Sequence, residues 1–337
     1  MRSRPLTRLL AAVLCTVGML GVAGLSGCSS TPAASSSGKI TVGFSAWPGW
    51  IPWQVAQDKG LFAKNGVDVE LKWFDSYTDS INALSTGAID ANSQTLNDTL
   101  SSVSGGAKQT IVLVNDNSTG NDKIIARDGI ASVGDLKGKK VAVEQGTVDH
   151  YLLLLALAEA KLTEKDVELV AMPTDAAAAA FVSGKVDAVG AFAPFTTTAL
   201  GRQGSRAIAT SAEFPGAIPD HLVFKAELVK DRPQVVQGMV NTWFETVKWI
   251  KDNRKEAMEI MAKRGAVSVP DYESYDSGTS IFTLKQNLDA FTPGTTPKNL
   301  NHQARLASEF LTNTGLAKSA PNVDGLFNDT FVKAVKE

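Results

Sequence analysis

Cysteine is nearly absent from this sequence of 337 residues, which contains only Cys15 and Cys28. The long region after Cys28 therefore offers no disulfide and no thiol nucleophile, and it is long enough to fold without them. Charge of one sign is also scarce. The formal net charge is −2, which removes the electrostatic basis for binding nucleic acid. Neither G-x-S-x-G nor H-E-x-x-H occurs, and no Cys/His metal spacing is present. The sequence predicts no metal, no cofactor and no catalytic activity.

Long apolar runs are missing too, apart from one near the start of the sequence. Residues 9–24 are apolar, follow an arginine-rich start and precede L-S-G-C at residues 25–28. This layout is typical of an export signal, and the run is shorter than the roughly 20 residues that cross a bilayer. The L-S-G-C segment resembles a bacterial lipobox, in which the cysteine is lipidated. A plain secretory signal with a chance cysteine is the alternative.

The lipobox interpretation divides the start of the chain into two parts. We expect residues 1–28 to be a lipoprotein signal peptide with Cys28 as the lipidation site. Residues 29–38 are rich in Ser, Ala and Pro and predict a flexible tether. The mature protein would then be exported and lipid-anchored at the outer face of the cell membrane, or in the periplasm. Its only membrane contact would be through the lipid.

One strand–helix–strand–helix pattern occurs twice in the rest of the sequence. Each copy has a short apolar strand, a helix, a second strand of similar composition and a closing motif of the type S/T-G-x-[IV]-D-A. The closing motifs lie at residues 86–91 and 183–188. Strands that alternate with helices predict parallel βαβ units. Two such units predict two α/β lobes, with a ligand cleft where the carboxyl ends of their strands meet.

The repeat and the helical C-terminal region together predict how the chain divides. We expect residues 39–121 and 225–337 to form lobe one and residues 122–224 to form lobe two, joined by two crossover strands. The second crossover is expected near residues 221–224. Helices are predicted over residues 233–250, 254–264, 271–288 and 298–313 from their apolar spacing. The Trp and Phe residues of the first of these helices are expected to lie in the core.

Four loops that follow predicted strands should face one another across the cleft, and they combine aromatic and acidic residues. They span residues 45–53, 92–98, 144–151 and 191–197 and contain no Arg or Lys. A dedicated anion site would often contain an arginine. Aromatic rings and carboxylates suit a small cation. The helix N-termini at these loops favour an anion, so both signs remain open. The candidate residues are Trp47, Asp98, Asp116, Glu144, Asp149 and Phe192, although Asp98 and Asp149 could be helix caps.

Several stretches resemble the solute-binding proteins of ABC importers, in the nitrate/sulfonate/taurine group that also includes binders of thiamine-pyrimidine precursors. They include A-W-P-G-W-I-P-W at residues 46–53, D-L-K-G-K-K-V-A-V-E-Q-G-T at 135–147 and F-V-S-G-K-V-D-A-V at 181–189. This resemblance implies a type II periplasmic-binding-protein fold that closes on its ligand. It also implies an ABC permease with its ATPase as partners, and a monomer. The ligand loops of the group map onto Trp47, Gln94, Thr147, Phe192 and Pro194, among others.

Three further strings are similar to a subgroup associated with urea- or guanidine-using pathways. They are N-D-N-S-T-G-N-D at residues 115–122, E-Q-G-T-V-D-H-Y at 144–151 and F-P-G-A-I-P-D-H at 214–221. The resemblance implies a small planar nitrogenous ligand, with guanidinium favoured over urea. Trp47 or Phe192 would stack on it, and Asp98, Glu144 and Asp149 would accept its N–H groups. An aliphatic sulfonate such as taurine, or nitrate, is the alternative. An enzyme of the thiamine-pyrimidine synthase type, which shares the fold, is a distant one.

Overall fold

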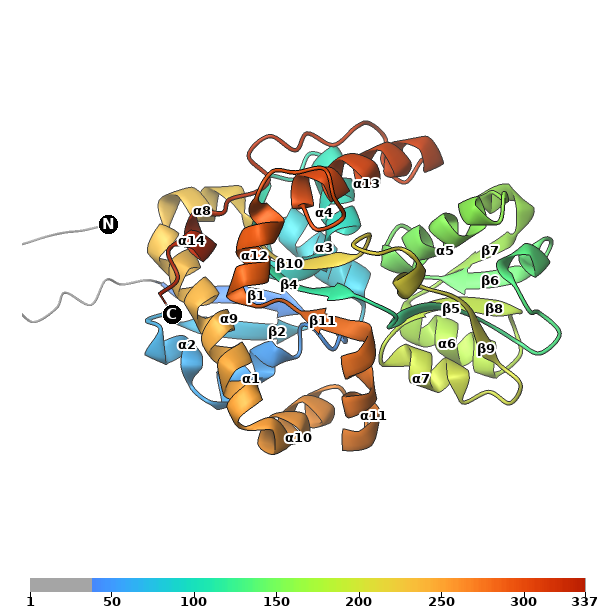
Figure 1. The fold of residues 1–337 in the computed structure, drawn as a ribbon, viewed down its shortest axis with the longest axis horizontal. Helices are drawn as coiled ribbons and strands as arrows, with labels where there is room; N and C mark the ends of the chain where they lie inside the picture. Colours follow the sequence, from blue (N-terminus) through green and yellow to red (C-terminus); the bar gives the residue numbers. More distant parts are fainter. Residues whose placement is uncertain (1–37, 337) are drawn as a thin grey trace, which may run out of the picture. The chain divides into compact units, whose positions relative to one another are not determined.

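The computed structural model describes residues 38–336. The predicted signal peptide, Cys28 and the predicted tether up to residue 37 lie outside these residues. Within them the chain forms a six-stranded and a five-stranded sheet, each flanked by helices, which lie at opposite sides of the view in Figure 1. We refer to the part around the six-stranded sheet as lobe one and to the part around the five-stranded sheet as lobe two.

The sheet of lobe one has the strand order β11-β4-β10-β3-β1-β2. Strand β1 runs parallel to both β2 and β3, whereas β10 is antiparallel to β3 and β4, and β11 is antiparallel to β4. All residues of β3 and β4 are buried. The strands are β1 (Ile40–Phe44), β2 (Val69–Trp73), β3 (Ala91–Thr95), β4 (Gln109–Ser118), β10 (Pro219–Lys225) and β11 (Thr279–Ile281).

The sheet of lobe two has the order β7-β6-β8-β5-β9 and repeats part of this plan. Its parallel triplet β7-β6-β8 matches β2-β1-β3, and each triplet is followed by an antiparallel strand, β5 or β10. Each of these two strands directly follows a passage from the other lobe. The predicted two-lobed α/β fold is therefore confirmed. The strands are β5 (Asp122–Ala126), β6 (Lys140–Val143), β7 (Glu168–Ala171), β8 (Ala188–Phe192) and β9 (Arg206–Thr210).

The second passage between the lobes comes earlier than the sequence pattern predicted. The chain leaves β9 at Thr210 and is already in the sheet of lobe one at Pro219, where β10 pairs with β3 and β4. Residues 219–224 thus belong to lobe one, and the predicted boundary at residue 224 is too late. An apolar run such as L-V-F shows that a strand is buried, but it does not show which sheet the strand joins.

Helices connect the strands of both lobes, and a longer helical region follows β10. The predicted helix over residues 233–250 is α9, in which Val236, Val240 and Trp243 are fully buried. In lobe one the connecting helices are α1 (Pro52–Asp58), α2 (Leu61–Lys64), α3 (Tyr77–Ser85) and α4 (Leu96–Ser104). In lobe two they are α5 (Val148–Glu159), α6 (Thr174–Val182) and α7 (Phe195–Leu200). The later helices are α8 (Ala226–Asp231), α9 (Pro233–Asp252), α10 (Arg254–Arg264), α11 (Val269–Ser274), α12 (Leu284–Phe291), α13 (Leu300–Thr314) and α14 (Thr330–Lys333).

The single helix predicted over residues 271–288 is wrong. Helix α11 ends at Ser274, β11 then pairs with the edge of β4, and α12 begins only at Leu284. At the break, Gly278 packs against the first passage between the lobes, since a Cβ there would lie 2.4 Å from Asn121 Oδ1. Tertiary contact thus overrides the local helical pattern. None of the helices formed by residues 38–336 is long and apolar enough to cross a membrane.

The contact between α9 and α1 is expected to dominate the stability of lobe one. Trp243 and Trp53 are fully buried, and their ring centroids lie 4.7 Å apart. Replacing Trp243 by Ala should lower the free energy of unfolding by about 3–5 kcal/mol, because it leaves a large cavity. Scanning calorimetry measures this loss. Trp249→Ala, on the half-exposed part of the same helix, is the control with a smaller expected effect. Equal losses in both variants would contradict the core position of Trp243.

Candidate functional site

A small cavity lies between the two lobes, which we call the interlobe cavity. It lies where the parallel strands β1, β3 and β8 end and the antiparallel strands β5 and β10 begin. Its volume is about 10 Å³, room for roughly one water molecule. The lobes are in contact around it, so this volume describes the closed arrangement. It is lined by Trp47, Trp50, Tyr77, Thr95, Asp122, Val148, Phe192, Ile218 and Asp220.

Aromatic rings from both lobes form one wall of the interlobe cavity. Phe192 of lobe two meets Trp47 and Tyr77 of lobe one edge to face, with ring centroids 6.4 and 6.2 Å apart. Trp50 packs on Tyr77 at 5.1 Å. These rings cross the boundary between the lobes, so this wall is complete only when the lobes are closed. The structure thus brings two of the sequence-predicted residues, Trp47 and Phe192, into the cavity lining.

Three aspartates gather at the ends of the strands that pass between the lobes. Asp116 near the end of β4 accepts a hydrogen bond from Trp47 Nε1 at 2.9 Å. Burial raises the pKa of Asp116 to about 7 and that of Asp122 to about 6. Burial, together with the charge of Asp116, raises the pKa of Asp220 well above its ordinary value. The carboxyl groups of Asp116 and Asp220 interact by a hydrogen bond, in which the protonated member of the pair donates. Apart from Asp116, no described residue offers a donor to Asp220, and none offers one to Oδ2 of Asp122. Asp122 and Asp220 both line the cavity.

The predicted residues Asp98 and Asp149 lie in the first turns of α4 and α5, each next to a lining residue. Asp98 accepts hydrogen bonds from Thr95 Oγ1 at 2.6 Å and from Asn97 Nδ2 at 2.8 Å, and burial raises its pKa to about 7. Asp149 accepts one from Thr174 Oγ1 at 2.6 Å, and burial raises its pKa well above the ordinary value. Neither side chain is part of the cavity lining.

Glu144, predicted to accept hydrogen bonds from a ligand, connects the two lobes instead. It follows β6 in lobe two, and its Oε1 accepts hydrogen bonds from Thr78 N at 2.9 Å and Thr78 Oγ1 at 2.7 Å. Thr78 belongs to the first turn of α3 in lobe one. Oε2 lies 2.8 Å from Thr174 Oγ1, whose one hydroxyl proton can go either to it or to Asp149. Because Oε1 accepts two hydrogen bonds from lobe one, the Glu144 side chain connects the lobes, and it is not part of the cavity lining.

The remaining predicted residues lie outside the lining. Thr147 is buried at the start of α5 and donates from Oγ1 to the Glu144 carbonyl at 2.8 Å. Gln94 is buried inside lobe one, where Nε2 donates to Thr99 Oγ1 at 2.9 Å. Pro194 precedes α7 and is partly exposed. The structure therefore groups Glu144, Thr147 and Asp149 at the start of α5 and separates Gln94 and Pro194 from them.

Sequence reasoning missed most of the cavity lining. Trp50 and Tyr77 carried no signal that separated them from core residues. Asp122 and Asp220 each begin or nearly begin a strand that enters a sheet after a passage between the lobes. An aspartate at the start of such a strand is the signal that could have found them.

The interlobe cavity is acidic and has no cation in its lining. None of its nine lining residues is Lys or Arg. Lys123 follows Asp122 in sequence, but its amino group donates to the Gly120 carbonyl. Within residues 38–336, no group of three or more His, Cys, Asp and Glu side chains is placed to hold a metal ion. The arrangement is chemically suited to a small molecule that brings both positive charge and N–H donors.

The buried carboxyl groups should make the ligand-free protein less stable as the pH rises. Asp98 and Asp116 have pKa values of about 7 and Asp122 of about 6 in the folded protein, against about 4 when unfolded. These carboxyl groups bind more protons in the folded state between about pH 4 and pH 7. His150 and His221, whose pKa burial lowers, act in the opposite direction below about pH 6.5, but the buried aspartates outnumber them. The free energy of unfolding therefore falls across this window. We expect a lower melting temperature at pH 7.5 than at pH 5, measured by calorimetry at constant ionic strength.

Two variants separate this effect from the titration of surface groups. Asp98→Asn removes one titrating group and should reduce the pH dependence, whereas Asp175→Asn, exposed at the start of α6, should leave it unchanged. Carboxyl groups with lowered pKa, such as Asp135 and Asp187, titrate below this window. A melting temperature that rises steadily from pH 5 to pH 7.5 would contradict the assignment.

Comparison with known proteins gives relatives along most of the described chain. A protein of Brucella abortus, provisionally named as a binding protein, is 31% identical over 213 residues, which are 62% of this chain and 66% of that protein. The match thus spans just under two thirds of that relative's length. A protein of Escherichia coli, provisionally named as binding aliphatic sulfonates, is 26% identical over 270 residues, 79% of this chain and 84% of that protein.

Solved structures share the fold at low sequence identity. The alkanesulfonate-binding protein SsuA from Xanthomonas axonopodis pv. citri, bound to MOPS, has a TM-score of 0.74 at 18% identity, covering 87% of this chain and 98% of that one. The desulfurization enzyme DszB has a TM-score of 0.61 at 17% identity, covering 87% and 98%. These likenesses show a periplasmic-binding-protein-like fold, and the fold alone does not separate binding from catalysis.

A family model decides the classification, because it matches residues 33–266, more than half of the chain. The protein belongs to the NMT1-like family.

Proposed function

We propose that this protein is the extracytoplasmic solute-binding component of an ABC importer, and that its ligand is a small nitrogenous cation of the guanidinium class. The observation that carries the choice of ligand is the acidic lining of the interlobe cavity. Asp122 and Asp220 line it, no donor reaches Oδ2 of Asp122, Asp220 has only the carboxyl group of Asp116 beside it, and no Lys or Arg lines the cavity. A guanidinium ion offers a delocalised positive charge and a planar array of N–H donors for such oxygens.

The energetics of burial support a cationic ligand. A buried carboxylate without a partner is strongly destabilising, and the raised pKa of Asp116, Asp122 and Asp220 expresses this penalty. A cation in the cavity offsets it by charge-assisted hydrogen bonds. The rings of Trp47 and Phe192 add attraction through their electron-rich faces. Because these groups come from both lobes, such a ligand bridges the lobes, and they part from the described arrangement far enough to widen the cavity of about 10 Å³ around it.

A sulfonate ligand is the second candidate, and the relatives favour it. The relative from Escherichia coli is named for aliphatic sulfonates, and SsuA is an alkanesulfonate-binding protein. The starts of α4 and α5 also point at the cavity, since Thr95 and Val148 line it. Helix N-termini attract anions. The two candidates differ in the sign of the ligand's charge, so one titration series separates them.

Transport rather than catalysis fits the chain best. Both named curated relatives carry the names of binding proteins. The predicted lipid anchor at Cys28 would hold the protein at the outer face of the cell membrane, where the closed lobes would present a joint surface to the permease. The resemblance implies that an enzyme of the thiamine-pyrimidine synthase type would carry a cysteine-rich motif. Residues 38–336 contain no cysteine, which disfavours this alternative.

Isothermal titration calorimetry of the purified protein tests the sign of the ligand's charge. We expect guanidinium to bind and taurine, ethanesulfonate and nitrate not to bind at matched ionic strength. Guanidinium affinity should rise from pH 5 to pH 8, because a cation favours the ionised forms of Asp116 and Asp122 and binding then releases protons. Urea serves as the neutral comparison and should bind more weakly, without this pH dependence.

Asp220→Asn tests the acidic lining directly. Loss of one charge-assisted interaction should weaken guanidinium binding about tenfold or more. Asp175 is exposed on α6 and does not line the cavity, so the Asp175→Asn variant should bind guanidinium as the unaltered protein does. Binding of taurine or ethanesulfonate that weakens as the pH rises would overturn the cation assignment. Such a result would leave an anion-binding importer component as the conclusion.

A further inference from the structure

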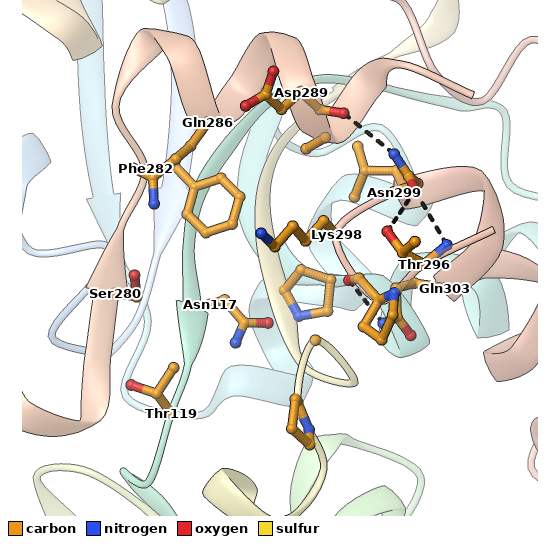
Figure 2. Close-up of a pocket in the computed structure, with 16 residues that line it drawn as sticks. Asn117, Thr119, Ser280, Phe282, Gln286, Asp289, Thr296, Lys298, Asn299 and Gln303 are labelled. Carbon is orange, nitrogen blue, oxygen red and sulfur yellow. Dashed lines mark hydrogen bonds between the residues drawn. The ribbon is translucent and has the colours of Figure 1, made fainter. Parts of the chain in front are cut away.

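A second and much larger pocket lies beside both passages between the lobes, and we call it the hinge pocket. Its volume is about 550 Å³, within the range of small-molecule sites. One wall comes from the passages themselves, through Asn117, Thr119 and Pro219. The other wall comes from the C-terminal part of lobe one, through Phe282 near α12 and Lys298 and Leu300 near α13 (Figure 2). The interlobe cavity has no lining residue in common with it.

Lys298 is the feature that gives the hinge pocket its charge. In Figure 2 its amino group points toward the ring of Phe282, across the open space of the pocket. Lys298 takes part in none of the ion pairs formed within residues 38–336. The acidic residue of the lining, Asp289, is instead paired with Lys285 at 2.6 Å, and Figure 2 shows its carboxylate directed away from Lys298. The pocket therefore carries one positive charge without a partner.

Asn117 supplies an independent sign of a ligand. Its side chain is buried, with 8% exposure, and lines the pocket. Its Nδ2 donates to the Ser118 carbonyl at 2.8 Å, but no donor among the described residues reaches Oδ1. A buried acceptor without a donor is destabilising. A ligand with an O–H or N–H group would satisfy it.

We propose that the hinge pocket binds a small organic anion with an apolar body and a hydrogen-bond donor. The anionic group, a carboxylate or sulfonate, pairs with Lys298. The apolar body lies between the ring of Phe282 and the Pro219 side of the pocket, and the donor reaches Asn117 Oδ1. This site is separate from the interlobe cavity, and the inference does not depend on which ligand that cavity takes.

Both walls of the hinge pocket belong to lobe one. Asn117 pairs with Pro219 of β10 and with Ser280 of β11, so the two walls are joined through one sheet. The segment before β10 also packs tightly on the loop before α13, since a Cβ at Gly216 would lie 2.4 Å from the Pro297 carbonyl oxygen. The pocket is therefore a site of lobe one that does not need the lobes to close.

Isothermal titration calorimetry with 4-hydroxybenzoate tests the site. We expect binding with a dissociation constant on the order of 1 mM, a typical affinity for a molecule of this size. The neutral isostere 4-hydroxybenzamide should bind at least tenfold more weakly. Lys298→Ala should lose about tenfold in affinity for the acid, because one charge-assisted hydrogen bond is removed. Lys318→Ala removes an exposed lysine that does not line the pocket and should leave the affinity unchanged.

Further variants locate the bound molecule. Phe282→Ala should weaken binding of both the acid and the amide, because it removes an apolar wall. Three results would overturn the proposal: no binding of 4-hydroxybenzoate at tenfold the expected dissociation constant, equal binding by the Lys298→Ala variant, or equal binding by the Phe282→Ala variant.

Discussion

The closed arrangement depends on carboxyl groups that are buried between two lobes without a cation beside them. Asp98, Asp116, Asp122, Asp149 and Asp220 are each nearly inaccessible to water, and burial raises the pKa of every one. A closed lobe pair near neutral pH must therefore hold extra protons, open to let in water, or admit a positive charge. The same constraint links ligand binding to conformation, because a cation relieves a penalty that exists only when the lobes are closed. Binding of a cation and the conformation of the lobes are therefore coupled.

The fold explains why the acidic groups collect where the molecule bends. Parallel strands of both sheets end at the interlobe cavity, and the strands that pass between the lobes end or begin there as well. Asp116, Asp122 and Asp220 lie on these passing strands, so they belong to the hinge and to the site at once. Several polar contacts span the boundary. Among them are Thr78 with Glu144, and Tyr275 with Thr197, whose hydroxyl oxygens are 2.8 Å apart. These contacts join the lobes around the interlobe cavity, whose lining contains no Lys or Arg.

Sequence reasoning succeeded where a local pattern decides the outcome and failed where partners are distant in the chain. The repeated βαβ pattern predicted both lobes, and the aromatic residues after strands β1 and β8 do line the cavity. Glu144 looked like a ligand residue because an acid at a strand end lacks a local partner. Its partner Thr78 lies 66 residues earlier, in the other lobe. Asp122 and Asp220 could be assigned to the cavity only once the directions of strands β5 and β10 were known. Their neighbours in sequence do not show which sheet these strands enter.

The positions of two acids bear on the sign of the ligand's charge. Helices α4 and α5 begin at the interlobe cavity, and a free helix N-terminus there would attract a sulfonate. Each of these helices has an aspartate of its own in the first turn, Asp98 in α4 and Asp149 in α5, both buried. An ionised carboxylate at this place interacts with the helix dipole and repels an incoming anion, so a sulfonate needs both aspartates protonated. Burial favours that state, since it raises the pKa of Asp98 to about 7 and that of Asp149 well above its ordinary value. A cation gains instead from every carboxylate that ionises. The same helix-start geometry therefore favours opposite ligands depending on whether the aspartate in the first turn is protonated.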